Sequence, residues 1–205
     1  VEAVSRRYRP DTLVLETEIS CDSGIIRVTD FMPIRENTDH HLPEIIRIVE
    51  GLEGAVDVSS ELSLRFDYGR SKPFVRKLDE GIHALAGPDG VVVVSPTEVT
   101  LDDHSVKCDL TVRTDERYVF QIVWHRSWEE IPPASEHLDA LEETTAFWRK
   151  WSEQCTYQGK ARDAVMRSLI TLKSLTYWPS GGVVAAATTS LPEPIGGERN
   201  WDSRY

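Results

Sequence analysis

The feature that most constrains this chain is a change of hydrophobic period at Ile131-Pro132-Pro133. Before this point, from residue 12 to about residue 126, apolar and polar residues alternate in short runs, which is the two-residue period of half-buried β-strands. After it, apolar residues recur at intervals of three, four and seven, which is the period of an α-helix. The sequence therefore predicts a mainly β part followed by a helical part.

The first part contains about eight predicted strands. No helical run separates them, and parallel strands need long crossover connections, so we expect an antiparallel β-sandwich. The last two runs predict a hairpin with Asp115-Glu116 at its tip, and Gly87-Pro88-Asp89-Gly90 predicts a turn. The predicted strands are 12–19, 25–31, 44–49, 56–66, 81–86, 91–94, 105–114 and 117–125.

The second part contains two predicted helices, 135–155 and about 161–177. Trp148 and Trp151 are three positions apart on the first helix, a spacing that fits either stacking on a sugar ring or, more commonly, core packing. The second helix has an apolar arc wide enough for burial on several sides. Gly181-Gly182, after Pro179, end it.

Composition narrows the classes of partner. Among 205 residues, Asp and Glu number 34 against 23 Lys and Arg, a formal net charge of −11 that repels phosphate backbones and argues against nucleic-acid binding. No apolar run reaches the roughly 18 residues of a membrane span, so no membrane partner is expected. Cys21, Cys108 and Cys155 are widely spaced, which favours free thiols and, with the acidic charge, a cytoplasmic location.

Histidine and cysteine patterns do not predict a metal or cofactor. Asp39 precedes His40-His41, but adjacent strand residues face opposite ways and a metal needs three or four converging ligands, so a polar loop is expected. His125 has no nucleophile motif such as GxSxG beside it and is interpreted as structural. The sequence also has no P-loop and no GxGxxG.

The tail from residue 181 to 205 is denser in binding chemistry. Seven residues there combine aromatic rings with Asp, Asn, Glu and Arg: Glu198, Arg199, Asn200, Trp201, Asp202, Arg204 and Tyr205. A sugar site needs rings for the apolar faces of the pyranose and fixed polar groups for its hydroxyls. A salt-bridged loop packed on the preceding helix fits the same residues, and both interpretations stay open.

Three runs in this region carry a resemblance to a known family: Ser174-Leu-Thr-Tyr177, Ala186-Ala-Thr-Thr-Ser-Leu-Pro-Glu193 and Ile195-Gly-Gly-Glu-Arg-Asn-Trp-Asp-Ser-Arg-Tyr205. They resemble the start of the catalytic domain of bacterial family 15 glycoside hydrolases, which include glucoamylase-like enzymes and trehalases. The upstream part resembles that family's N-terminal β-sandwich. The resemblance implies a sandwich domain 1–131 that lacks its first strands, a linker helix 132–158, and an incomplete (α/α)6 barrel 159–205.

The resemblance implies an inverting hydrolase of α-glucosidic bonds, which uses one carboxylic acid to protonate the leaving oxygen and one carboxylate to activate water. It places both catalytic glutamates beyond residue 205, so we expect this chain to be a piece of a longer protein, to hold no catalytic residue and to be inactive alone. It implies that Trp201, Ser203, Arg204 and Tyr205 border the sugar, an α-linked glucose disaccharide or oligosaccharide. Ser203 departs from the usual Tyr of the family.

Two other functions remain open from the residues. The chain would then be a non-catalytic sandwich that docks on a barrel domain or binds glucan, or a scaffold whose helices pair with another chain. The sequence leaves the oligomeric state and the choice of α-glucoside undetermined.

Overall fold

A computed structural model describes residues 1–34, 42–102, 105–132, 137–177 and 180–184. By compactness the chain divides into two units, residues 1–147 and 148–205. The strands of the first unit form an antiparallel β-sandwich, and α-helices follow these strands in the sequence, which confirms the predicted fold class.

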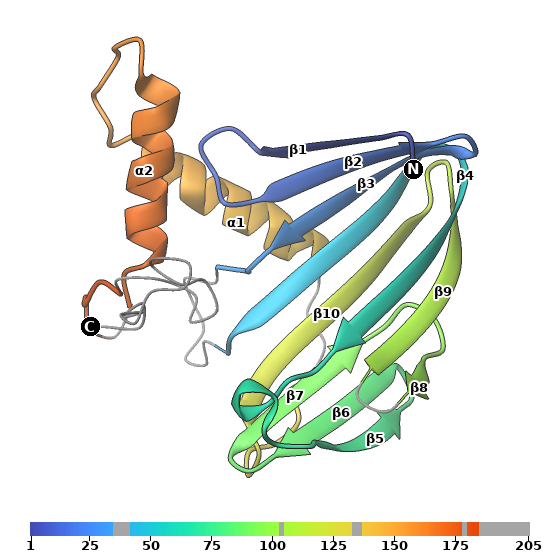
Figure 1. Cartoon of the computed structure of the whole chain (residues 1–205). Coiled ribbons are helices and arrows are strands. Elements are labelled where there is room, and N and C mark those ends of the chain that lie inside the picture. Colours follow the sequence, from blue (N-terminus) through green and yellow to red (C-terminus); the bar gives the residue numbers. More distant parts are fainter. Residues whose placement is uncertain (35–41, 103–104, 133–136, 178–179, 185–205) are drawn as a thin grey trace, which may run out of the picture. The chain divides into compact units, whose positions relative to one another are not determined.

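The sandwich consists of a larger and a smaller sheet (Figure 1). The larger sheet has the order β1-β2-β3-β4-β10-β7-β6-β5, and the smaller one joins β4, β9 and β8. The strands are β1 (Ala3–Tyr8), β2 (Leu15–Cys21), β3 (Gly24–Phe31), β4 (Glu44–Ser63), β5 (Phe74–Leu78), β6 (Gly81–Ala86), β7 (Asp89–Val94), β8 (Thr100–Asp102), β9 (Ser105–Arg113) and β10 (Arg117–Arg126).

Strand β4 belongs to both sheets, and the runs 44–49 and 56–66 predicted as separate strands are one continuous element. Its first part pairs with β3 and β10, and its last part, from Ala55 to Ser63, pairs with β9. Gly51 lies at the change of sheet, where a Cβ would approach the backbone oxygen of Arg113 to 1.9 Å. A glycine at this position therefore lets two backbones meet where the strand leaves one layer for the other.

The predicted hairpin of 105–114 and 117–125 is wrong, because β9 and β10 each pair with a successive part of β4 and not with each other. The amide of Gly51 donates to the oxygen of Glu116 (2.9 Å), and that of Asp115 donates to the oxygen of Gly51 (3.0 Å). Asp115 has a left-handed φ of 66°. The polar dipeptide forms a corner at which the chain changes sheet alongside β4, and it does not reverse the chain.

Two apolar clusters hold the sandwich unit together. One lies between the sheets and consists of Ile26, Val49, Val56, Phe66, Ile82, Ala84, Val93, Val99, Val106, Cys108, Leu110 and Val112. The other combines Val14, Phe31, Ile46 and Ile48 with Ala140 of helix α1 (His137–Ser152). The amide of Ile34 also donates to the hydroxyl of Thr144 (3.0 Å). The first half of α1 is therefore part of the sandwich core.

The second unit contains helix α2 (Arg162–Ser174), which buries Met166 and Ile170. After it, the amide of Tyr177 donates to the oxygen of Gly182 (2.7 Å), and Gly181 takes a left-handed φ of 70°. The helix ends within three residues of the predicted point. Neither α1 nor α2, the helices that the structure describes, is long and apolar enough to cross a membrane.

Candidate functional site

The residues predicted to border a sugar, Trp201, Ser203, Arg204 and Tyr205, lie outside the described residues. The same holds for His40 and His41. The described chain ends at Val184, whose amide donates to the oxygen of Leu175 (2.8 Å) and so closes the turn that follows α2. The candidate sites that can be built from atoms therefore lie upstream of the tail.

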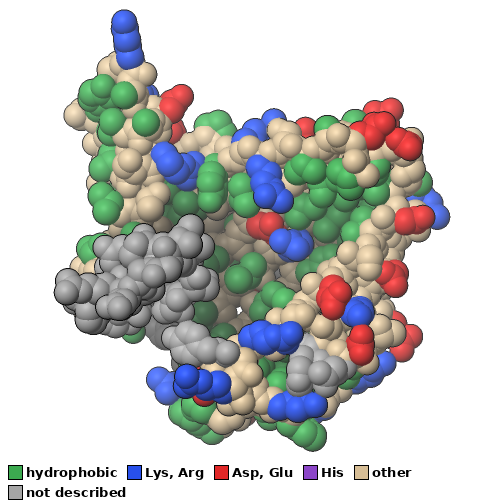
Figure 2. All heavy atoms as spheres, in the orientation of Figure 1, with side chains coloured by type: hydrophobic (Ala, Val, Ile, Leu, Met, Phe, Trp, Pro, Cys, Tyr) green, Lys and Arg blue, Asp and Glu red, His purple; other side chains and the backbone are tan. Residues whose placement is uncertain are grey.

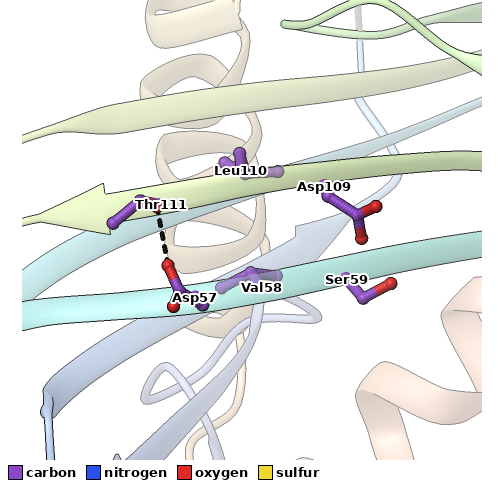
Figure 3. A pocket seen from close by; sticks show the side chains of 6 residues that line it. All are labelled: Asp57, Val58, Ser59, Asp109, Leu110 and Thr111. Carbon is purple, nitrogen blue, oxygen red and sulfur yellow. Dashed lines mark hydrogen bonds between the residues drawn. The ribbon is translucent and has the colours of Figure 1, made fainter.

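An open groove of about 500 Å³ runs over β4 and β9 (Figure 3). Asp57 and Ser59 on β4 lie opposite Thr111 and Asp109 on β9, and the hydroxyl of Thr111 donates to the carboxylate of Asp57 (2.6 Å). Alternation along the strands directs Leu110 into the core between the sheets. The groove presents two carboxylates and two hydroxyls to solvent.

Among the described residues, the lining of this groove is Asp57, Val58, Ser59, Asp109, Leu110 and Thr111, without an aromatic ring. Sugar sites combine hydrogen-bonding groups with rings that cover the apolar faces of the pyranose. The described lining of the groove therefore offers hydrogen bonds to a polyol and no stacking platform.

A second pocket, of about 370 Å³, opens between the two sheets (Figure 2). Figure 2 shows hydrophobic side chains in this hollow and charged ones at its rim. Among the charged lining residues, Arg47 donates to both carboxylate oxygens of Asp30 (2.7 and 3.0 Å), and this hydrogen bond raises the pKa of the Arg47 guanidinium. The pair neutralises itself, and Ile45, Phe120 and Ile122 make much of the remaining lining apolar. This chemistry does not suit the many hydroxyls of a sugar.

The paired tryptophans pack as their spacing indicates. Trp148 is 4% exposed, and its ring meets that of Trp151 edge to face with centroids 6.2 Å apart. A buried ring is not available as a sugar platform. The three cysteines, all within the described residues, form no disulfide.

His125 has a structural environment, as predicted, but its partner is a residue that sequence analysis missed. Its Nε2 lies 3.0 Å from Nε2 of His83, and both rings are buried. Burial lowers the pKa of His83, and the nearby His125 and Arg76 lower it further. His83 sits in the ordinary strand run 81–86, so no local pattern singled it out. Within the described part of the chain, no three His, Cys, Asp or Glu side chains converge to hold a metal.

Similarity to known proteins identifies the context of these sites. The chain is 36% identical over 205 residues to a trehalase of Thermoplasma volcanium. The alignment covers 98% of this chain and 33% of that protein. Over nearly its whole length the chain is therefore similar in sequence to a trehalase. Trehalases of Thermoplasma acidophilum and Mycobacterium tuberculosis are 34% and 29% identical, again over 98% of this chain and over 35% and 33% of their own lengths.

The sequence similarity to trehalases covers only part of those proteins. The chain spans about a third of the length of the curated trehalases that it matches. No family model matches it. A solved structure described as a putative kojibiose phosphorylase from human microbiome aligns with 83% of this chain and with 24% of its own chain, with a TM-score of 0.42 and 8% sequence identity.

Proposed function

We propose that this chain is the β-sandwich and first helices of an α-glucoside hydrolase of trehalase type, which acts in carbohydrate metabolism. The observation that carries the proposal is the similarity to trehalases over 98% of the chain. The order of sandwich and then helices agrees with it. The sandwich supplies structure in this proposal, and neither the groove nor the inter-sheet pocket serves as the hydrolytic site.

In finer detail, we propose membership of glycoside hydrolase family 15 and an (α/α)6 barrel that begins near residue 159, after a sandwich 1–131 and a linker helix 132–158. An exposed apolar side chain of α2 supports this, because Leu172 is 56% exposed and suits contact with a further helix. The reaction would invert the anomeric carbon by paired carboxylates. Those carboxylates would lie outside this chain, which alone would be inactive.

The proposed sugar contacts are Trp201 and Tyr205 through their rings, and Arg204 and Ser203 through polar groups. Trehalose or another α-linked glucose disaccharide or oligosaccharide is the proposed substrate. Ser203 would leave a gap where a tyrosine ring and hydroxyl stand in family 15 enzymes. A Ser203→Tyr change should therefore raise the activity of an enzyme that contains this chain.

A chimera tests the proposal directly. This chain replaces the matching segment of the Thermoplasma volcanium trehalase, and glucose release from trehalose and maltose is measured with and without Ser203→Tyr. We expect a folded chimera that hydrolyses trehalose, with higher kcat for the tyrosine variant and an unchanged circular dichroism spectrum. A folded chimera without activity on either sugar, in both forms, would contradict the proposal.

The chain alone separates this function from a glucan-binding module. Isothermal titration of the purified chain with maltose and trehalose should give no heat, and incubation with either sugar should release no glucose. Saturable heat with maltose would favour the binding module instead. A cytoplasmic location remains a proposal, which fractionation of cells that produce the protein would test.

A further inference from the structure

Two histidines that the proposed function does not use meet inside the sandwich unit. His83 lies on β6 and His125 on β10, with β7 between them, and they are 4% and 1% exposed. Their Nε2 atoms are 3.0 Å apart, and the rings stack with centroids at 5.0 Å and an angle of 26°. Two groups that can each take up a proton therefore share one contact away from water.

Gly90 makes this contact possible. It lies opposite His125 on β7, and a Cβ at this position would stand 2.6 Å from Nε2 of His125. The imidazole therefore crosses β7 over bare backbone and reaches His83 on the next strand. Any side chain at position 90 would displace the ring and separate the pair.

The geometry limits how many protons the pair can hold. In the neutral pair, one ring donates its Nε2–H and the other accepts with a bare Nε2. One extra proton leaves a hydrogen bond between an imidazolium and a neutral ring. With a second extra proton, two N–H donors and two positive charges face each other at 3.0 Å without an acceptor. Neither Nδ1 atom has a hydrogen-bond partner among the described residues.

The surrounding charges do not relieve this conflict. On β5, Arg76 lies opposite His83 and adds a further positive charge. On β7, the carboxylate of Asp89 accepts a hydrogen bond from the indole N–H of Trp124 on β10 (2.9 Å). On β4, Glu44 accepts a hydrogen bond from the amide of Gln121. Burial, His125 and Arg76 all lower the pKa of His83.

We propose that His83 and His125 form a proton-sensitive lock, a contact that holds β5, β6 and β7, the end strands of the larger sheet, against β10. The lock holds while the pair carries at most one extra proton. It opens when both imidazoles become charged, because the two like charges can then move apart only if β6 and β7 move away from β10. The device makes the stability of the sandwich unit fall as the pH drops below about 6.5, the ordinary pKa of histidine.

Urea unfolding of the whole chain between pH 5 and 8 tests the proposal, with the wild type compared with His83→Gln. The glutamine amide can still bond to His125 but cannot become charged. Because burial lowers the pKa of His83, this histidine binds fewer protons in the fold than in the unfolded chain, so stability should be complete above about pH 6.5 and fall below it. The unfolding constant should rise up to about tenfold per pH unit for each extra proton of the unfolded state. We expect His83→Gln to reduce this slope by about one proton, and equal slopes would overturn the proposal.

Arg76→Gln is the matched control. It removes the neighbouring cation and leaves the pair intact, so the pKa of His83 should rise towards its ordinary value. The loss of stability should then still begin near pH 6.5 with the same initial slope but level off at a higher pH than in the wild type. Loss of the slope in this variant would assign the pH dependence to Arg76 and overturn the proposal.

A measurement on the wild type decides the matter if His83→Gln does not fold. Nitrogen-15 spectra of the imidazole rings should show opposite tautomers at pH 8 and no folded species with both rings charged. If both rings titrate independently at or above pH 6.5 while the chain stays folded, the lock does not exist.

Discussion

At the scale of single residues, Gly51 decides whether β4 can serve both sheets. A Cβ there would lie 1.9 Å from the oxygen of Arg113, and this neighbour is backbone that cannot rotate away. We expect Gly51→Ala to lower the free energy of unfolding by about 3 kcal/mol or more, since overpacking of this kind forces the backbone to move. Chemical denaturation monitored by circular dichroism measures the loss.

Gly87→Ala is the control for that prediction. Gly87 has a left-handed φ of 58°, and a Cβ there would meet nothing within 4 Å. Alanine should therefore cost only the conformational penalty, about 1 kcal/mol. Equal losses at Gly51 and Gly87 would show that close approach at the sheet corner is unimportant.

Ion pairs attach the exposed strand β1 to β2 through Glu16. Burial tends to raise the pKa of Glu16, but hydrogen bonds from Arg9 (2.7 Å) and Arg7 (3.3 Å) outweigh it, so the pKa lies below its usual value of 4.5. A carboxylate with a lowered pKa contributes stability above pH 4.5 and loses it as the pH falls further. We expect Glu16→Gln to cost about 1 kcal/mol at pH 7.

The pH dependence of that variant is its own control. The difference between wild type and Glu16→Gln in urea unfolding should shrink as the pH falls from 5 to 3, because the wild-type carboxyl then becomes neutral as well. A difference that is constant over this range would mean that the charge of Glu16 does not stabilise the fold.

At the scale of elements, α2 separates buried from exposed apolar positions only two residues apart. Ile170 is fully buried, whereas Leu172 is 56% exposed. We expect Ile170→Ala to cost about 2–5 kcal/mol, and Leu172→Ala to stay within about 0.5 kcal/mol. Thermal unfolding followed at the helical wavelength of 222 nm measures both. Similar losses for the two variants would contradict the burial pattern.

Sequence analysis missed three strands, β1, β5 and β8, which have no alternating internal pattern. In β5 only Val75 and Leu78 are half-buried, and they are three positions apart. All six residues of β1 are exposed, so no alternation of apolar and polar positions marks it. β8 has three residues, too few to show a period. The predicted hairpin failed for a different reason, because alternation within β9 and β10 is the same whether they pair with each other or with β4.

At the scale of the whole molecule, the boundary of the sandwich can be tested. The predicted sandwich 1–131 lacks α1, although Ala140 packs in its second cluster and Thr144 accepts a hydrogen bond from the amide of Ile34. We expect a chain of residues 1–131 to be less stable to urea than one of residues 1–152 and to bind more of the dye ANS. Equal stability would show that the helix is only a connection.

The sequence by itself determined the class of fold, the place where strands give way to helices, and the relationship that leads to trehalases. These properties follow from local hydrophobic periods and contiguous motifs, such as the change of hydrophobic period at Ile131-Pro132-Pro133. Only the tertiary structure decided that β4 joins two sheets and that His83 faces His125 across Gly90. Both arise from contacts between residues distant in sequence, because strand register and the choice of neighbouring strand leave no mark in the period of either strand.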